Sequence, residues 1–128
     1  NVQVSGYYDN NMAQEVFNLT NQERANNGLP AYSWDSNMAS YSDRRAKEIV
    51  TDYSHNSAGG NWSVGENIAE GETSASEVVN DWMNSAGHKA NILSDVSTKT
   101  SVSCYVENFT YADGSTQYLY HWVQNFTH

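Results

Sequence analysis

Three titratable side chains of the sequence lie where loops are expected to meet regular elements: His55, Glu66 and His88. His55 falls in a polar, glycine-rich stretch, Glu66 directly follows one glycine, and His88 directly follows another. Side chains at the edges of elements can be directed by a rigid scaffold into a shared cleft. Two imidazoles and one carboxylate could bind zinc with the fourth position open to water. They could equally serve as an acid–base pair near neutral pH.

Structural roles for the same three residues stay open, because spacing alone does not bring them together. His55 and His88 are far apart in the sequence, unlike the i,i+4 histidine pair of a metalloprotease helix. His55 can be a solvated loop residue, and His88 can cap its own short helix. Glu66 can be a buried carboxylate that accepts hydrogen bonds from loop amides.

The remaining candidate residues favour structural roles. His121 is expected to be a hydrogen-bonded strand histidine, and Glu77 to belong to a capping box that begins at Ser74. Cys104 alternates within a strand and is expected to be a buried, unreactive thiol. No serine lies in a nucleophile-elbow pattern, and no glycine-rich loop has phosphate-binding spacing.

The elements that position these residues follow from hydrophobic periodicity and turn signals. Helices are predicted over residues 11–26, 35–50, 74–85 and 88–93, and strands over 101–106 and 118–126. Asp113-Gly114 predicts the hairpin turn between the two strands. Residues 1–9 have no clear pattern and are expected to form an extended tail. Helices followed by an antiparallel sheet indicate an α+β domain.

Composition excludes several classes of protein. The 128 residues suit one domain, and the net charge of −9 argues against binding to nucleic acid or to anionic lipid. No apolar run approaches the ~20 residues of a membrane-spanning helix. A single cysteine excludes an internal disulfide. The many Asn, Ser, Thr and Tyr residues, together with a start at Asn1, favour an exported chain whose signal has been removed.

Several segments occur in the order in which the CAP superfamily has them, and together they resemble its bacterial branch. This superfamily contains cysteine-rich secretory proteins, insect venom allergens and pathogenesis-related class 1 proteins, and its module is also called the SCP-like extracellular domain. The matching segments are Asn21-Gln22-Glu23-Arg24, Gly28-Leu29-Pro30, Trp34-Asp35, Ser54-His55, Gly65-Glu66-Asn67-Ile68-Ala69, Trp82-Met83-Asn84-Ser85, Gly87-His88-Lys89-Ala90-Asn91-Ile92-Leu93 and Tyr120-His121-Trp122-Val123-Gln124-Asn125-Phe126.

The resemblance implies a three-layer α-β-α sandwich with a central three-stranded antiparallel sheet, formed by residues 10–128 after the tail of residues 1–9. It also implies a cleft lined by a His-Glu-Glu-His tetrad, which binds zinc or another divalent cation in some members. His55, Glu66 and His88 match three positions of the tetrad, and Ser85 occupies the position of the second Glu. Ser85 and Asn67 are expected to be neighbours of this cleft.

Three functions follow as hypotheses. The first is a secreted CAP-domain protein that binds a divalent metal or a small polar or peptide ligand through two His and one Glu. The second is a metal-dependent hydrolase, a protease or a cell-wall-active enzyme, in which Glu66 cannot easily be both ligand and general base. The third is a structural or adhesive extracellular protein. Expected partners are a small molecule, a peptide, or a surface glycan or lipid, bound by a monomer outside the cell or at its surface.

Overall fold

The computed structural model describes residues 1–128 and contains five strands and four helices. In chain order they are β1 (Gln3–Tyr8), α1 (Asn10–Asn26), β2 (Ser33–Trp34), α2 (Ser36–Thr51), β3 (Gly65–Glu70), α3 (Ala75–Met83), α4 (Ala86–Ile92), β4 (Lys99–Thr110) and β5 (Thr116–Thr127). None of the helices is both long and apolar enough to cross a membrane.

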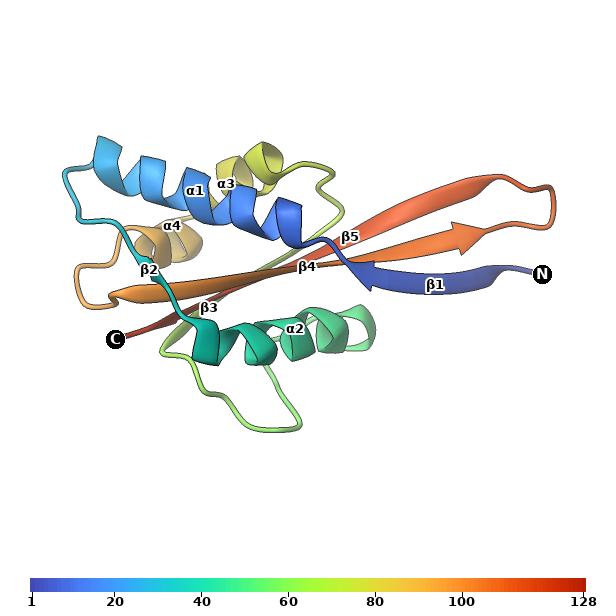
Figure 1. Cartoon of the computed structure of the whole chain (residues 1–128), viewed down its shortest axis with the longest axis horizontal. Helices are drawn as coiled ribbons and strands as arrows, with labels where there is room; N and C mark the ends of the chain where they lie inside the picture. The colour runs from blue at the N-terminus through green and yellow to red at the C-terminus, as the bar shows by residue number, and fades with distance from the viewer.

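The strands form one sheet in the order β1-β4-β5-β3, and the short β2 pairs in parallel with β4. Helices α1, α3 and α4 cover one face and α2 covers the other, while the β4–β5 hairpin extends past the helices together with β1 (Figure 1). The α+β sandwich is therefore confirmed. Beyond the three antiparallel strands that the family resemblance implied, the sheet includes β1 and β2.

The N-terminal segment, expected to form an extended tail, is a strand of the sheet. Gln3–Tyr8 are extended, but they pair antiparallel with β4, from Gln3 opposite Thr110 to Tyr8 opposite Tyr105. All six residues of β1 are exposed. The segment therefore lacks the apolar alternation that reveals a half-buried strand, and its pairing depends on the free edge of β4.

The helix starts follow the sequence signals closely. Asp9, Asp35 and Ser74 each accept a hydrogen bond from a backbone N–H in the first turn of α1, α2 and α3. Helix α4 begins at Ala86, earlier than predicted, so His88 lies inside it and does not cap it. Its N-cap residue is Ser85, whose side chain makes no capping hydrogen bond.

The alternation predicted for the last strand places its side chains on two faces. Trp122 and Phe126 of β5 join the larger core beneath α1, α3 and α4. Val123, between them, packs with Ala46 and Ile49 of α2 on the opposite face. The candidate site lies on this second, smaller face.

Candidate functional site

Glu66 reaches the site from β3, a strand that the sequence did not reveal. It lies opposite Asn125 of β5 in the antiparallel pairing of the two strands. Asn125 Nδ2 donates a hydrogen bond of 2.9 Å to Glu66 Oε2. The pairing of two strands thus fixes the carboxylate over the face that α2 covers.

Arg45 of α2 meets this carboxylate with a bidentate ion pair. Its Nε lies 2.9 Å from Glu66 Oε2 and its Nη2 lies 2.8 Å from Glu66 Oε1. The Arg45 side chain is fully buried, and only 8% of the Glu66 side chain is exposed. The planar fork of a guanidinium matches a carboxylate in this geometry, which gives a strong and well-oriented pair.

The same guanidinium also fixes the loop that carries His55. Arg45 Nη2 donates to the carbonyl oxygen of Ser54 at 2.6 Å, and Nη1 donates to that of Asn56 at 2.8 Å. These two carbonyls flank His55 in the chain. His55 Nδ1 lies 2.9 Å from Glu66 Oε1, while 61% of the side chain stays exposed. One buried cation therefore positions both the carboxylate and the imidazole.

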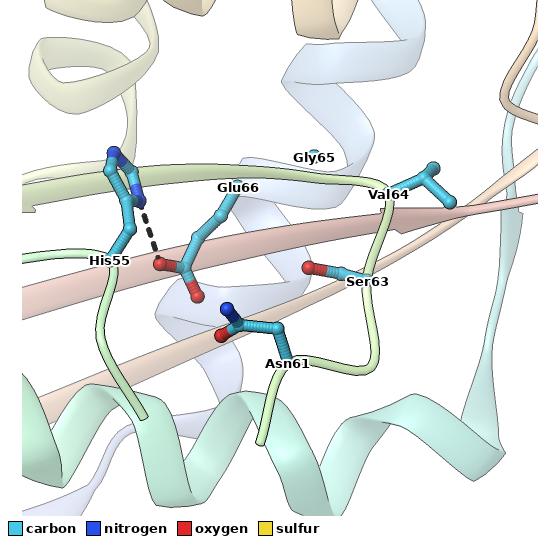
Figure 2. A pocket seen from close by; sticks show the side chains of 6 residues that line it. All are labelled: His55, Asn61, Ser63, Val64, Gly65 and Glu66. Atoms are coloured by element: carbon cyan, nitrogen blue, oxygen red, sulfur yellow. Dashed lines mark hydrogen bonds and ion pairs between the residues drawn. The ribbon is translucent and has the colours of Figure 1, made fainter. Parts of the chain in front are cut away.

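The protonation state of the pair follows from its partners. Burial alone would raise the pKa of Glu66, but hydrogen bonds from Arg45, Asn125 and His55 together lower it below its ordinary value. An ionised carboxylate only accepts hydrogen bonds, so His55 Nδ1 must be the donor. The second ring nitrogen, Nε2, points away from Glu66 and is free for another partner (Figure 2).

A pocket of about 260 Å³ adjoins this pair. It is lined by His55, Asn61, Ser63, Val64, Gly65 and Glu66 (Figure 2). The volume is below the roughly 300–1,000 Å³ of sites that enclose drug-sized ligands. A single sugar ring, a small polar molecule or one peptide side chain is the size of ligand that it suits.

Comparison with known proteins decides the family. The family model "CAP: Cysteine-rich secretory protein family" matches residues 17–126. The chain belongs to the CAP family. The Bacillus subtilis protein YkwD is 31% identical to this CAP chain in an alignment of 110 residues that covers 74% of the chain and 42% of YkwD.

Two further proteins are similar to this chain. The secreted protein RBT4 of Candida albicans is 29% identical over 83 residues, covering 65% of the chain and 23% of RBT4. A crystal structure of an extracellular protein containing an SCP domain from Bacillus anthracis superposes with a TM-score of 0.73 at 26% identity, over 93% of this chain and 41% of that one. The chain therefore spans less than half the length of each of these relatives.

The CAP tetrad positions are only partly brought together in this chain. His55 and Glu66 are hydrogen-bonded, as described above. His88 is half-buried, and its ring centroid lies 6.4 Å from that of Trp82. Burial, followed by the nearby His55, lowers the pKa of His88. His88 lies near the pair, as its charge interaction with His55 indicates, but it does not line the pocket.

The two expected neighbours of the cleft lie outside the pocket lining. Ser85 precedes α4. Asn67 follows Glu66 in β3 and therefore points to the opposite face of the sheet. There its Nδ2 donates to Gln124 Oε1 at 3.4 Å and to the carbonyl oxygen of His88 at 3.3 Å. Asn67 connects β3 to α4 and the larger core.

The residues present do not fit the divalent cation that the family resemblance implied. Glu66 Oε1 accepts from Arg45 and His55, and Oε2 accepts from Arg45 and Asn125. These four hydrogen bonds use the roughly four acceptor positions of a carboxylate. No group of three or more His, Cys, Asp or Glu side chains is arranged to hold a metal ion. A cation at Glu66 would also have to displace the buried Arg45 guanidinium.

The structural roles predicted for the other candidates are confirmed. His121 is fully buried, with Nε2 2.7 Å from Glu107 Oε1. Glu77 donates its backbone N–H to the side chain of Ser74, as the capping box requires, but its carboxylate accepts at 2.9 Å from the N–H of Thr73, one residue before the N-cap. Cys104 is a free, buried thiol whose pKa is raised to about 12, mainly by burial.

Sequence reasoning missed Arg45 and Asn125 as members of the site. Arg45 lies on the apolar stripe of α2 among the buried residues Met38, Tyr41 and Ile49. A charged side chain on a buried helix face requires a partner of opposite charge, so this position was a usable signal. Asn125 gave no signal in the sequence, because its role depends on the pairing of β5 with β3.

Proposed function

We propose that this chain is an extracellular CAP binding module whose pocket beside His55 accepts a small polar or peptide ligand. The observation that carries the proposal is the buried Arg45–Glu66 ion pair, which presents an exposed imidazole at a polar hollow. An extracellular location is supported by the relatives, because RBT4 is named a secreted protein and the Bacillus anthracis structure an extracellular protein.

The chemistry of the pocket favours recognition through hydrogen bonds. The His55 Nε2 atom has no partner within the chain, and the Asn61 side chain is exposed at the rim. Because Arg45 fixes the His55 loop from both sides, little conformational entropy is lost when a ligand binds. Since Glu66 is neutralised by Arg45, the ligand needs no positive charge to enter. A divalent cation has no free acidic ligand here, which favours an organic ligand over a metal.

Hydrolysis is a second candidate, favoured by one observation. In many hydrolytic sites an imidazole acts as the base and a buried carboxylate orients it. In such a site His55 Nε2 would take the proton of an attacking water. Turnover of a peptide or peptidoglycan library that disappears in His55→Ala would support this function, and equal turnover in that variant would exclude it.

Binding can be tested by nuclear magnetic resonance with a panel of N-acetylated dipeptide amides. We expect at least one probe to shift the backbone amide signals of residues 55 and 61–66 in a saturable manner. His55→Ala should abolish these shifts, while His128→Ala, a matched change at the chain end, should preserve them. No saturable shift with any probe, or the same shifts in His55→Ala, would contradict the proposal.

A further inference from the structure

An exposed tryptophan stands beside the pocket and has no role in the site described so far. The Trp62 side chain is 58% exposed, whereas Trp82 and Trp122 are 1% and 0% exposed. Trp62 lies in the chain between Asn61 and Ser63, which both line the pocket. Trp62 does not itself line the pocket, but its indole stacks on Tyr41, whose hydroxyl bonds the lining residue Asn61, so the ring lies close to the rim of the hollow.

The indole is held in a defined orientation by α2. It stacks on the ring of Tyr41, with centroids 5.6 Å apart and planes inclined by 8°. Tyr41 is buried, and its hydroxyl donates to Asn61 Oδ1 at 3.2 Å. The guanidinium carbon of Arg44 lies 5.0 Å from the centroid of Tyr41 and 5.7 Å from that of Trp62. One face of the indole is thus packed, and its large exposed fraction leaves the other face to solvent.

From this arrangement we infer that Trp62 and the His55 pocket form a subsite for a neutral, β-linked pyranose saccharide. This inference rests on the proposed binding function and names the class of its ligand. Pyranose rings with equatorial hydroxyls present axial C–H groups on a flat, apolar face. The electron-rich face of an indole attracts such C–H groups, and the fixed ring loses little entropy on contact.

The residues beside the indole supply hydrogen-bond donors for the sugar hydroxyls. Asn61 uses its Oδ1 atom for Tyr41, which leaves its amide N–H groups to donate outward. Ser63 accepts from Asn125 through its oxygen, so its hydroxyl hydrogen can donate to a ligand. A second, linked ring that enters the pocket meets His55, which lines it, and the exposed Val64 offers it an apolar contact.

Charge selects a neutral saccharide over an acidic one. The chain has a net charge of −9, so an anionic polysaccharide is repelled at long range. The one buried cation beside the pocket, Arg45, is already paired with Glu66 and Glu48. Arg44, the cation beside the indole, donates to the carbonyl oxygen of Gly60 and lies 3.9 Å from Glu48, and no cation lines the hollow itself to compensate a sugar carboxylate or sulfate.

The test is calorimetric titration of the chain with cellohexaose and with chitohexaose. We expect saturable binding of at least one of the two, weakened about tenfold or more in Trp62→Ala because a central aromatic contact is lost. Trp62→Phe should retain part of the affinity. Tyr118→Ala removes an aromatic side chain that is 51% exposed on β5 and should bind as the wild type does.

Fluorescence gives an independent measurement, since Trp62 is by far the most exposed of the tryptophans described above. The saccharide should protect wild-type emission from acrylamide quenching, and this protection should vanish in Trp62→Phe. Binding of neither hexasaccharide, or equal affinity in Trp62→Ala, would overturn the inference and leave Trp62 as a cover for Tyr41 and Arg44. The dipeptide titration reports on the His55 pocket separately, so failure of the saccharide subsite and failure of the proposed function are distinguishable.

Discussion

Replacement of Arg45 by methionine tests the core of the site most severely. The substitution keeps the apolar stem of the side chain but removes its charge and all five of its hydrogen bonds, two of them to Glu66. The carboxylate of Glu66, which is 8% exposed, then remains as a buried charge without its cation. We therefore expect Arg45→Met to destabilise the fold and to release the His55 loop.

The size of the effect can be estimated from the burial of the pair. Removal of one partner of a buried ion pair typically costs about 3–5 kcal/mol. With an unfolding entropy of roughly 2.1 cal/mol/K per residue, a chain of this length loses about 10–20 °C in melting temperature. When Glu66→Gln is added to Arg45→Met, the uncompensated negative charge is removed. The double variant should therefore be about 1–2 kcal/mol more stable than Arg45→Met alone.

Thermal and urea unfolding of the wild type, the two single variants and the double variant provide the measurement. Arg44→Met is the matched control, because the Arg44 side chain is 37% exposed and its ion pair with Glu48, at 3.9 Å, is worth less than about 1 kcal/mol. The pKa of Glu66 is lowered in the folded wild type, so its stabilising contribution is present above pH 4.5 and is lost as the pH falls further. The stability gap between wild type and Arg45→Met should therefore narrow in acid.

Three results would refute this reasoning. Arg45→Met could unfold with the same midpoint as Arg44→Met, the double variant could be less stable than Arg45→Met, or the gap to the wild type could widen in acid. Each would mean that Glu66 is not a buried anion that depends on Arg45.

Three smaller effects follow from groups outside the pocket. Burial, with Asp81 adding to it, raises the pKa of Glu72 from 4.5 to about 7, so the stabilising protonated form is lost as the pH rises through that range. In urea unfolding, Glu72→Gln should therefore be more stable than the wild type by about 1 kcal/mol at pH 8, after allowance for solvent screening, and equally stable at pH 4. The thiol of Cys104, with its pKa raised to about 12 by burial, should react with a thiol reagent only after denaturation, and rapid native labelling would contradict this. Ser74→Ala removes the side-chain cap of α3 and should cost about 1 kcal/mol, whereas Ser76→Ala in the first turn of α3 should cost much less.

The helices were predictable because their signals are local. Asp35 and Ser74 each begin a helix within one residue of the predicted start, and the apolar stripe of α2 recurs at steps of three and four. Strands β1 and β3 were not recognised, since Gln3–Tyr8 are exposed and β3 begins with the polar stretch Gly65-Glu66-Asn67. Their pairing depends on β4 and β5, which lie far away in the sequence.

The candidate site was predictable only in part. His55 and Glu66 were recognised by residue type and by their match to the CAP motifs, and the structure joins them in one hydrogen bond. The ionisation and pairing of Glu66 were not predictable, because four donor atoms from three separate segments of the chain meet at its two oxygens. Arg45 was visible in the sequence as a charged residue on an apolar stripe, and its significance follows from the cost of burying an unpaired charge.

The central claim is that Glu66 remains a paired anion that orients His55 and leaves His55 Nε2 free for a ligand. A long-range ¹H–¹⁵N spectrum of the histidine side chains in mildly alkaline solution, recorded before and after addition of zinc, tests it most directly. The account predicts that neutral His55 carries its proton on Nδ1 and that equimolar zinc leaves the signals of both His55 and His88 unchanged. A proton on Nε2, or stoichiometric zinc shifts at both histidines, would contradict the account.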